Sequence, residues 1–94
     1  MARVKVKVYG HLQNLFNEKE FDVDLPDQST LEDLISHIGK IYGKEKETEL
    51  RPKEPAKFPI MIIVGNKDHR FLDGMNTALG EGTIVYFMPP AVGG

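Results

Sequence analysis

Two segments near the N-terminus alternate strictly between apolar and polar residues. In residues 3–9 (RVKVKVY), three valines fall on one side, and two lysines, an arginine and Tyr9 on the other. Residues 20–25 (EFDVDL) alternate in the same way, but their polar side is acidic. A period of two predicts half-buried strands. A basic-faced strand followed by an acidic-faced one predicts an antiparallel pair joined by cross-strand ion pairs. The connection, roughly residues 10–19, is long for a hairpin and is expected to carry a helical turn.

The next segment changes to a helical period. Residues 29–32 (STLE) have the form of a capping box, in which the Ser29 hydroxyl accepts a hydrogen bond from the Glu32 amide and the Glu32 side chain reaches back. Gly43 suits the C-terminal end of a helix. The pattern therefore predicts a helix at about 30–42. Its apolar stripe consists of Leu31, Leu34, Ile35, Ile38, Ile41 and Tyr42.

The second half of the chain is less regular. Residues 44–58 are highly charged, contain two prolines and predict a solvated surface loop. Residues 60–64 (IMIIV) form an apolar run, which predicts a strand that is central or covered on both faces. Residues 69–72 predict a short edge strand. Residues 83–88 predict the last strand, with Ile84, Tyr86 and Met88 on one side and Val85 and Phe87 on the other. Leu79 precedes that strand as a lone apolar anchor in a loop.

This order of elements, β-β-α-β-(β)-β, predicts the fold. One amphipathic helix must lie across one face of a mixed sheet, and the economical arrangement places the first and last strands side by side and parallel in the middle. We therefore expect an α+β fold of the β-grasp (ubiquitin-like) type, with a mixed four- to five-stranded sheet and one main helix on one face. Residues 1–88 are expected to form this domain, and residues 89–94 a flexible C-terminal Gly-Gly tail.

Composition narrows the function classes. A formal net charge of −2 gives no electrostatic basis for binding nucleic acid or an anionic membrane. The longest apolar run, residues 60–64, is far shorter than the roughly 20 residues of a membrane span. The chain has no cysteine, which excludes disulfides and a thiol nucleophile, and its three histidines are too widely spaced to predict a metal site. With no export signal recognised at the N-terminus, a cytoplasmic location is expected.

The last eight residues, FMPPAVGG, have a chemistry of their own. Pro89 and Pro90 fix φ and offer no amide donor, so the preceding strand cannot continue through them. Gly93 and Gly94 have no Cβ, so they can pass through a narrow channel. Residues 89–94 reach at most about 20 Å when extended. We therefore expect an arm that enters a partner's pocket, with partner contacts from Phe87, Pro89, Pro90, Ala91, Val92 and Gly93.

Residues 79–94 (LGEGTIVYFMPPAVGG) resemble the small subunits of molybdopterin synthase, which are ubiquitin-like sulfur carriers. The resemblance implies that the Gly94 carboxylate is adenylated with ATP by a ubiquitin-activating-like adenylyltransferase and then converted to a thiocarboxylate. The sulfur would go to the dithiolene of molybdopterin, inside the synthase large subunit. It also implies a non-catalytic subunit that binds no cofactor, metal, nucleic acid or membrane.

Other functions use the same tail. The chain is also compatible with a sulfur carrier for thiamine thiazole or for transfer RNA thiolation, although thiazole carriers are usually shorter and lack the Pro-Pro pair. A further alternative is a protein modifier joined to target lysines through Gly94. A Gly-Gly end alone is a weak signal, because at average glycine usage it occurs by chance in about 0.5% of chains. Its combination with Pro-Pro, an adjoining strand and this order of elements is what favours a carrier or modifier over a tail without a role.

Overall fold

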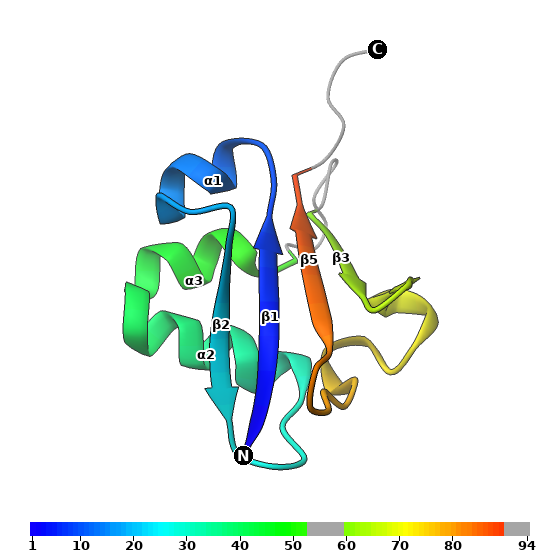
Figure 1. The fold of residues 1–94 in the computed structure, drawn as a ribbon. Helices are drawn as coiled ribbons and strands as arrows, with labels where there is room; N and C mark the ends of the chain where they lie inside the picture. The colour runs from blue at the N-terminus through cyan, green and yellow to red at the C-terminus, as the bar shows by residue number, and fades with distance from the viewer. Residues whose placement is uncertain (53–59, 90–94) are drawn as a thin grey trace.

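The computed structural model describes residues 1–52 and 60–89. The strands form one sheet in the order β2-β1-β5-β3-β4, in which β1 and β5 are parallel and every other pair is antiparallel (Figure 1). The first and last strands therefore lie side by side in the middle, which confirms the predicted β-grasp roll. The strands are β1 (Ala2–Val8), β2 (Glu20–Leu25), β3 (Met61–Val64), β4 (Lys67–Asp68) and β5 (Ile84–Met88).

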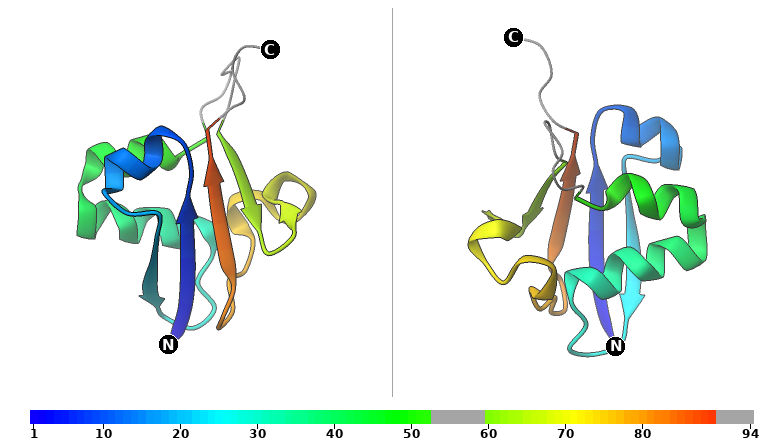
Figure 2. Two further views of the ribbon diagram at one scale, coloured as in Figure 1. Left: turned by 45° about the horizontal axis from the view of Figure 1, so that its top comes forward. Right: turned by 180° about the vertical axis from the view of Figure 1, so that it is seen from behind.

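The longer helices cover one face of this sheet. Seen from behind, α2 and α3 cross the sheet, whereas the other face carries no helix (Figure 2). Every second residue of β1, β2 and β5 points toward the helices and is buried there, as the period of two predicts. The helical elements are α1 (His11–Phe16), α2 (Leu31–Tyr42), α3 (Lys44–Leu50) and the 3₁₀ turns η1 (His69–Phe71) and η2 (Gly74–Asn76).

The predicted ion pairs between β1 and β2 are present. The Arg3 guanidinium lies 3.1 Å from Asp24, and the Lys5 ammonium lies 3.0 Å from Glu20 and 3.5 Å from Asp22. These side chains are largely exposed, so solvent screens the attraction and the pairs contribute mainly to strand register. The hydrogen bond from Lys5 lowers the pKa of the Glu20 carboxyl.

The capping box of α2 is displaced by one residue from its predicted position. Thr30, not Ser29, is the N-cap: its hydroxyl accepts from the Asp33 amide at 3.3 Å, and the Asp33 carboxylate accepts from the Thr30 amide at 2.9 Å. The Ser29 hydroxyl instead donates to the Pro26 carbonyl, while the Ser29 carbonyl accepts from the Leu79 amide. The contact with the buried residue Leu79 fixes Ser29 outside the helix.

The apolar stripe of α2 is narrower than predicted. Four of its six predicted residues are fully buried, and Tyr42 packs beside them on the core. Ile41 is instead 57% exposed, because the C-terminal turn of α2 passes the edge of the sheet.

The prediction of a solvated loop over 44–58 is wrong for its first half. Residues 44–50 form α3, and Leu50 is fully buried beneath it. Arg51 then joins the two helices, with hydrogen bonds of 2.7 Å to Glu32 on α2 and 2.7 Å to Glu47 on α3. These bonds raise the pKa of the Arg51 guanidinium and lower the pKa of both carboxyls. Residues 53–59 lie outside the described part of the chain.

The prediction for residues 60–64 is confirmed in one of its two forms. β3 lies inside the sheet, paired with β5 and β4, whereas its residues alternate between exposed and buried, so it is not covered on both faces. The predicted strand over 69–72 is wrong, because β4 ends at Asp68 and η1 follows. The Asp68 carboxylate accepts from the Arg70 amide at 2.9 Å, which turns the chain into the 3₁₀ conformation.

Gly39 yields a test of the contact between α2 and α3. A Cβ at this position would overlap the Glu47 carboxylate and lie 2.9 Å from the Glu47 Cβ. Alanine normally stabilises a helix interior by about 1 kcal/mol relative to glycine. Here we expect Gly39→Ala to lower the free energy of unfolding by about 1–3 kcal/mol, because α3 must move away.

Urea denaturation measures this change, and Gly80→Ala is the control. Gly80 has an ordinary φ and no atom within 4 Å of a built Cβ, so its substitution is expected to change stability by less than about 0.5 kcal/mol. A stabilised Gly39→Ala variant would show that α3 does not pack against α2 in this way.

Candidate functional site

The C-terminal segment leaves the sheet from its central strand. β5 lies between β1 and β3, and because β1 runs parallel to it, the ends of both strands meet at one edge of the sheet (Figure 1). The Tyr9 amide donates to the Phe87 carbonyl at 3.2 Å, which is the last such bond before the prolines. Pro89 has no amide hydrogen and cannot extend this ladder. Residues 90–94 lie outside the described residues, so the roles predicted for Pro90, Ala91, Val92, Gly93 and Gly94 stay predictions.

Pro89 packs into a space left by Gly10. A Cβ on Gly10 would lie 2.7 Å from the Pro89 Cγ, and Gly10 has φ 61°, a conformation that favours glycine. Gln13 stabilises this turn with two hydrogen bonds. Its backbone amide donates to the Gly10 carbonyl at 3.1 Å, and its side-chain amide donates to the Val8 carbonyl at 3.1 Å. This turn therefore fixes where the chain leaves the sheet. In the sequence, Gly10 indicated only the end of a strand.

Phe87 has a different position from the one predicted. It was expected to contact a partner, but its side chain is fully buried in the core together with that of Val85. The alternation of β5 points both residues toward the helices. Phe87 therefore anchors the strand that carries the tail and offers no side-chain surface to a partner in this structure.

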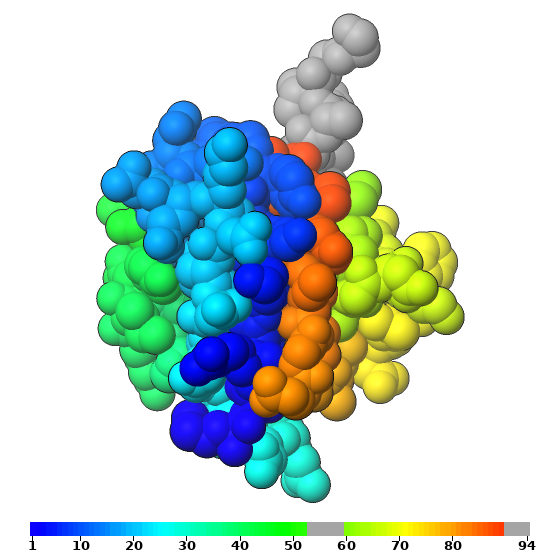
Figure 3. Space-filling model, in the orientation of Figure 1, coloured from blue at the N-terminus to red at the C-terminus, as the bar shows by residue number. Residues whose placement is uncertain are grey.

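The open face of the sheet carries an apolar surface next to this exit point. Tyr9 is 38% exposed and Met61 43% exposed, and Tyr86 stacks on Tyr9 with ring centroids 6.4 Å apart. β1, β5 and β3 lie side by side on this face (Figure 3). Apolar surface of this kind marks sites of protein–protein contact. We call it the open-face patch, and its residues are Tyr9, Met61, Ile63, Ile84, Tyr86 and Met88.

The sequence predicted which residues of the last strand share the open side, but it did not identify them as part of an exposed apolar patch. Ile84, Tyr86 and Met88 were expected on one side of the last strand, and that prediction is confirmed. The strand pairings add the neighbours, because Met61 lies opposite Met88 and Ile63 opposite Tyr86. The signal was the presence of apolar residues on both sides of this strand.

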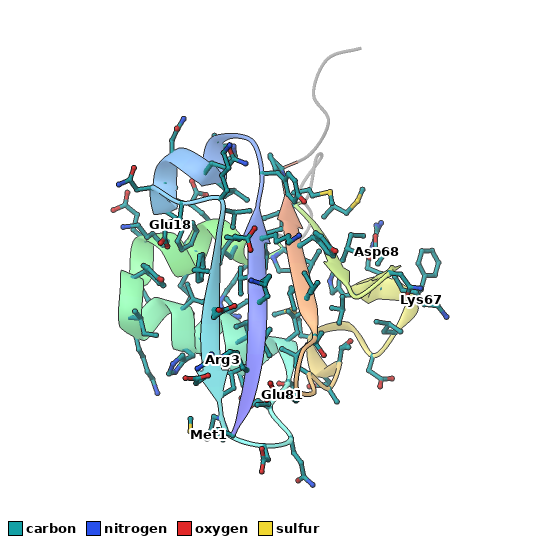
Figure 4. The ribbon with its side chains drawn as sticks, viewed as in Figure 1. Met1, Arg3, Glu18, Lys67, Asp68 and Glu81 are labelled. Atoms are coloured by element: carbon teal, nitrogen blue, oxygen red, sulfur yellow. The ribbon has the colours of Figure 1, made fainter. Side chains whose placement is uncertain are left out.

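Charged residues gather toward the other end of the same face. Arg3 and Glu81 lie there, away from the end at which β5 finishes (Figure 4). The Arg3 amide donates to the Glu81 carboxylate at 2.9 Å, which ties the turn before β5 to the start of β1. Together with the ion pairs along β1 and β2, this divides the open face into a charged half on β1 and β2 and an apolar half on β5 and β3, and the apolar half borders Pro89.

The histidines take separate structural positions. His69 is buried, with its Nδ1 3.3 Å from the Asp68 carboxylate, and hydrogen bonds from Arg70 lower the pKa of Asp68 to about 2. Within residues 1–52 and 60–89, no three histidine or acidic side chains come together as they would around a metal ion. The same residues include no helix with the length and apolar character needed to cross a membrane.

Comparison with protein families identifies the chain. Residues 6–94 match the ThiS family. The chain belongs to this family. This family is one of ubiquitin-like sulfur-carrier proteins, in agreement with the β-grasp fold and with a Gly-Gly tail that follows the central strand in the sequence. No curated protein sequence matches the chain.

Solved structures share the fold at low sequence identity. A Pyrococcus furiosus protein titled "Putative molybdopterin converting factor, subunit 1" is 24% identical (TM-score 0.76; 97% of this chain and 100% of that one covered). The small archaeal modifier protein 1 of Methanosarcina acetivorans is 23% identical (TM-score 0.75; 100% and 98%). Mycobacterium tuberculosis CysO is 27% identical (TM-score 0.71; 94% and 99%).

The contact of Gly10 with Pro89 predicts a measurable effect. Gly10→Ala is expected to lower the free energy of unfolding by about 1–3 kcal/mol for the backbone conformation of φ 61° and ψ −139°, which is almost exclusive to glycine, and by about 1–3 kcal/mol more for the overlap with Pro89. Gly65→Ala is the control for positive φ alone, because Gly65 has φ 66° but no atom within 4 Å of a built Cβ. Urea denaturation and the amide NMR shifts of Tyr9 and Met88 report the difference. Equal losses in the two variants, with unchanged Met88 shifts, would show that Gly10 does not seat Pro89.

Proposed function

We propose that this chain is the sulfur-carrying subunit of a molybdopterin synthase. Its Gly94 carboxylate is adenylated by a ubiquitin-activating-like adenylyltransferase, converted to a thiocarboxylate, and used as the sulfur source for the dithiolene inside the synthase large subunit. The observation that carries the proposal is the position of the Pro-Pro-Ala-Val-Gly-Gly segment. In the sequence it follows the central strand directly, and Pro89, its first residue, lies at the end of an apolar patch that a partner can cover.

The chemistry needs an activated carboxyl group. A terminal carboxyl has a pKa of roughly 3.3–3.7, so at neutral pH it is ionised and unreactive toward nucleophiles. In the proposed activation, the Gly94 carboxylate attacks the α-phosphate of ATP and releases pyrophosphate. Hydrosulfide then forms a bond to the Gly94 carbonyl carbon as AMP leaves with the electron pair of the broken C–O bond. Loss of the remaining proton on sulfur gives the thiocarboxylate.

Sulfur delivery uses the same terminal group as a nucleophile. The thiocarboxylate sulfur bonds to a carbon of the pterin precursor as an oxygen substituent leaves that carbon with its electron pair, and water then cleaves the bond between that sulfur and the Gly94 carbonyl carbon. The sulfur stays on the precursor, and the Gly94 carboxylate is restored. Every proton transfer and every precursor contact belongs to the partner in this scheme, so the small chain contributes position and a terminal carbonyl.

The body of the protein suits docking outside a deep site. Residues 89–94 reach at most about 20 Å, so the arm can enter a pocket while the sheet stays at its mouth. The channel of the partner then contacts residues 89–93 of the arm, namely Pro89, Pro90, Ala91, Val92 and Gly93. The open-face patch packs against the partner surface around the channel. The P. furiosus protein of the same fold carries a molybdopterin-related title, which supports this assignment. Because adenylation consumes ATP, the reaction also favours a cytoplasmic location.

A protein-modifier function is the second candidate. The M. acetivorans neighbour of this fold is titled a small archaeal modifier protein, and adenylation at a terminal glycine is common to both functions. The two diverge at the next nucleophile, which is sulfur for a carrier and a lysine amine for a modifier. Carriers for thiamine thiazole or transfer RNA thiolation share the sulfur step and differ in the acceptor.

Deletion of Gly94 tests the role of the terminal carboxyl. The reacting carbonyl moves back by up to about 3.5 Å, which takes it out of the adenylation site. We expect formation of the acyl adenylate and of the thiocarboxylate to be abolished, with an unchanged thermal midpoint. Lys40→Ala, which changes an exposed residue of α2 and leaves the tail intact, is the control and is expected to retain the activity. A truncated protein that accepts sulfur at the wild-type rate would contradict the channel argument.

Sulfur loading tests the assignment itself. Incubation with the adenylyltransferase, ATP and a sulfur donor is expected to shift the intact mass by one oxygen-to-sulfur exchange. Addition of the synthase large subunit is then expected to convert the sulfur-free pterin precursor. Isopeptide-linked ladders in cell extracts, together with a loaded protein that never sulfurates the precursor, would instead establish the modifier function.

A further inference from the structure

The positive charges of β1 are unevenly matched by β2. The strand register places Arg3 opposite Asp24, Lys5 opposite Asp22 and Lys7 opposite Glu20. Lys5, however, binds two carboxylates, with its ammonium 3.0 Å from Glu20 and 3.5 Å from Asp22. As far as the structure describes the chain, Lys7 has no carboxylate within ion-pair distance. The one lysine whose acidic neighbour is taken by another residue is therefore the one closest to the end of β1.

Lys7 lies at the border between the charged half of the open face and the open-face patch. Its neighbour on β5 is Tyr86, which in turn lies opposite Ile63 on β3. The Lys7 ammonium is 5.8 Å from the centre of the Tyr86 ring, and that ring stacks on Tyr9. A cation over a tyrosine face is held by the negative charge density of the ring. Lys7 is thus placed against the patch, on the strand that leads to the Gly10 turn.

A partner that covers the patch must also neutralise the charge of the Lys7 ammonium. Covering Tyr86 removes water from the Lys7 ammonium, and a desolvated ammonium without a counter-charge is strongly unfavourable. Glu20 lies opposite Lys7 in the strand register and attracts it, but the Glu20 carboxylate accepts its hydrogen bond from Lys5, which is the main cause of its lowered pKa. Among the described residues no carboxylate lies within ion-pair distance of Lys7, so we expect the partner to supply the counter-charge once the patch is covered.

We propose that Lys7 pairs with an aspartate or glutamate on the partner protein whose apolar surface covers the open-face patch. This inference rests on the proposed function, because it concerns the face that docks beside the tail. The partner surface is therefore apolar with one acidic side chain at its border, opposite Lys7. The ion pair determines which proteins dock and in which register they do so, because a shift along the face would leave the ammonium buried and unpaired.

Four variants of the full chain separate this role from net charge. Lys7→Glu reverses the charge, Lys7→Gln removes it, and Lys7→Arg retains it. Lys40→Glu is the matched control, since Lys40 is exposed on α2, on the helical side of the sheet, and the substitution changes the formal net charge of −2 by the same amount as Lys7→Glu. Thermal unfolding of each variant checks that the fold is kept. Lys7→Gln serves in place of Lys7→Glu if repulsion between the introduced carboxylate and Glu20 destabilises the charge-reversed variant.

Binding is measured by surface plasmon resonance against the synthase large subunit and against the adenylyltransferase, at several salt concentrations. For at least one partner, we expect Lys7→Glu to weaken binding by about tenfold or more, mainly through a lower association rate, and Lys7→Gln to weaken it several-fold. Lys7→Arg is expected to stay near wild type, and Lys40→Glu within about twofold. The affinity of the wild type is expected to fall with salt, and that of Lys7→Gln to fall much less.

Two different failures can be told apart. If the wild type binds and Lys7→Glu weakens binding no more than Lys40→Glu for both partners, the inference is wrong and the proposed function stands. If the wild type binds neither partner, the proposed function fails and this inference fails with it.

Discussion

The parallel pairing of β1 with β5 is the interaction on which the rest of the structure depends. It joins the two ends of the domain, with Val6 next to Val85 and Val8 next to Phe87. Pairing segments so far apart in sequence requires closure of a long loop, so it persists only because both strands are buried on their inner face. Parallel strands end at the same edge, and this brings the Gly10 turn to Pro89.

The same pairing makes β5 serve two purposes. Its inward residues, Val85 and Phe87, are fully buried and hold the strand, while Tyr86 and Met88 lie on the open face. A slip of one residue would exchange these sets and place Phe87 in water. The register of β5 therefore both anchors the start of the tail and exposes the residues of the patch. A protein whose reactive group is its own terminal carboxyl needs no catalytic side chains, but it does need a fixed origin for the tail.

Most of the sheet could be predicted from the sequence, because β1, β2 and β5 each have a clear period of two, and the polar sides of β1 and β2 each carry one sign of charge. Prediction failed where two local patterns compete. Both Ser29 with Glu32 and Thr30 with Asp33 fit a capping box. Distant backbone bonds, from the Leu79 amide to the Ser29 carbonyl and from the Leu31 amide to the Thr77 carbonyl, decide between them. A short-range pattern contains no information about a contact fifty residues away.

The failure at α3 has a different cause. Its seven mostly charged residues show little amphipathic period, and the helix depends on buried Leu50 and on the bonds that Arg51 makes to both helices. For the candidate site, sequence analysis likewise reached only part of the features. The chemistry proposed for Gly94 rests on a resemblance of the tail, whereas the packing of Pro89 against Gly10 and the open-face patch depend on strand pairings.

This division bears on how carriers and modifiers of one fold are distinguished. Both activate a terminal glycine, so the tail supplies the reactive carbonyl and does not discriminate between acceptors. Discrimination has to lie on the surface that docks beside the tail, and here that surface combines stacked tyrosines with a lysine whose acidic neighbour is already bound. An apolar patch alone accepts many partners, because burial of apolar area is not directional. One charge at its border changes this, since any partner that covers the patch without supplying a carboxylate incurs the full cost of desolvating the ammonium. In the proposed scheme, the residue that selects the docking partner therefore lies on β1, at the opposite end of the sequence from Gly94, the residue proposed to react.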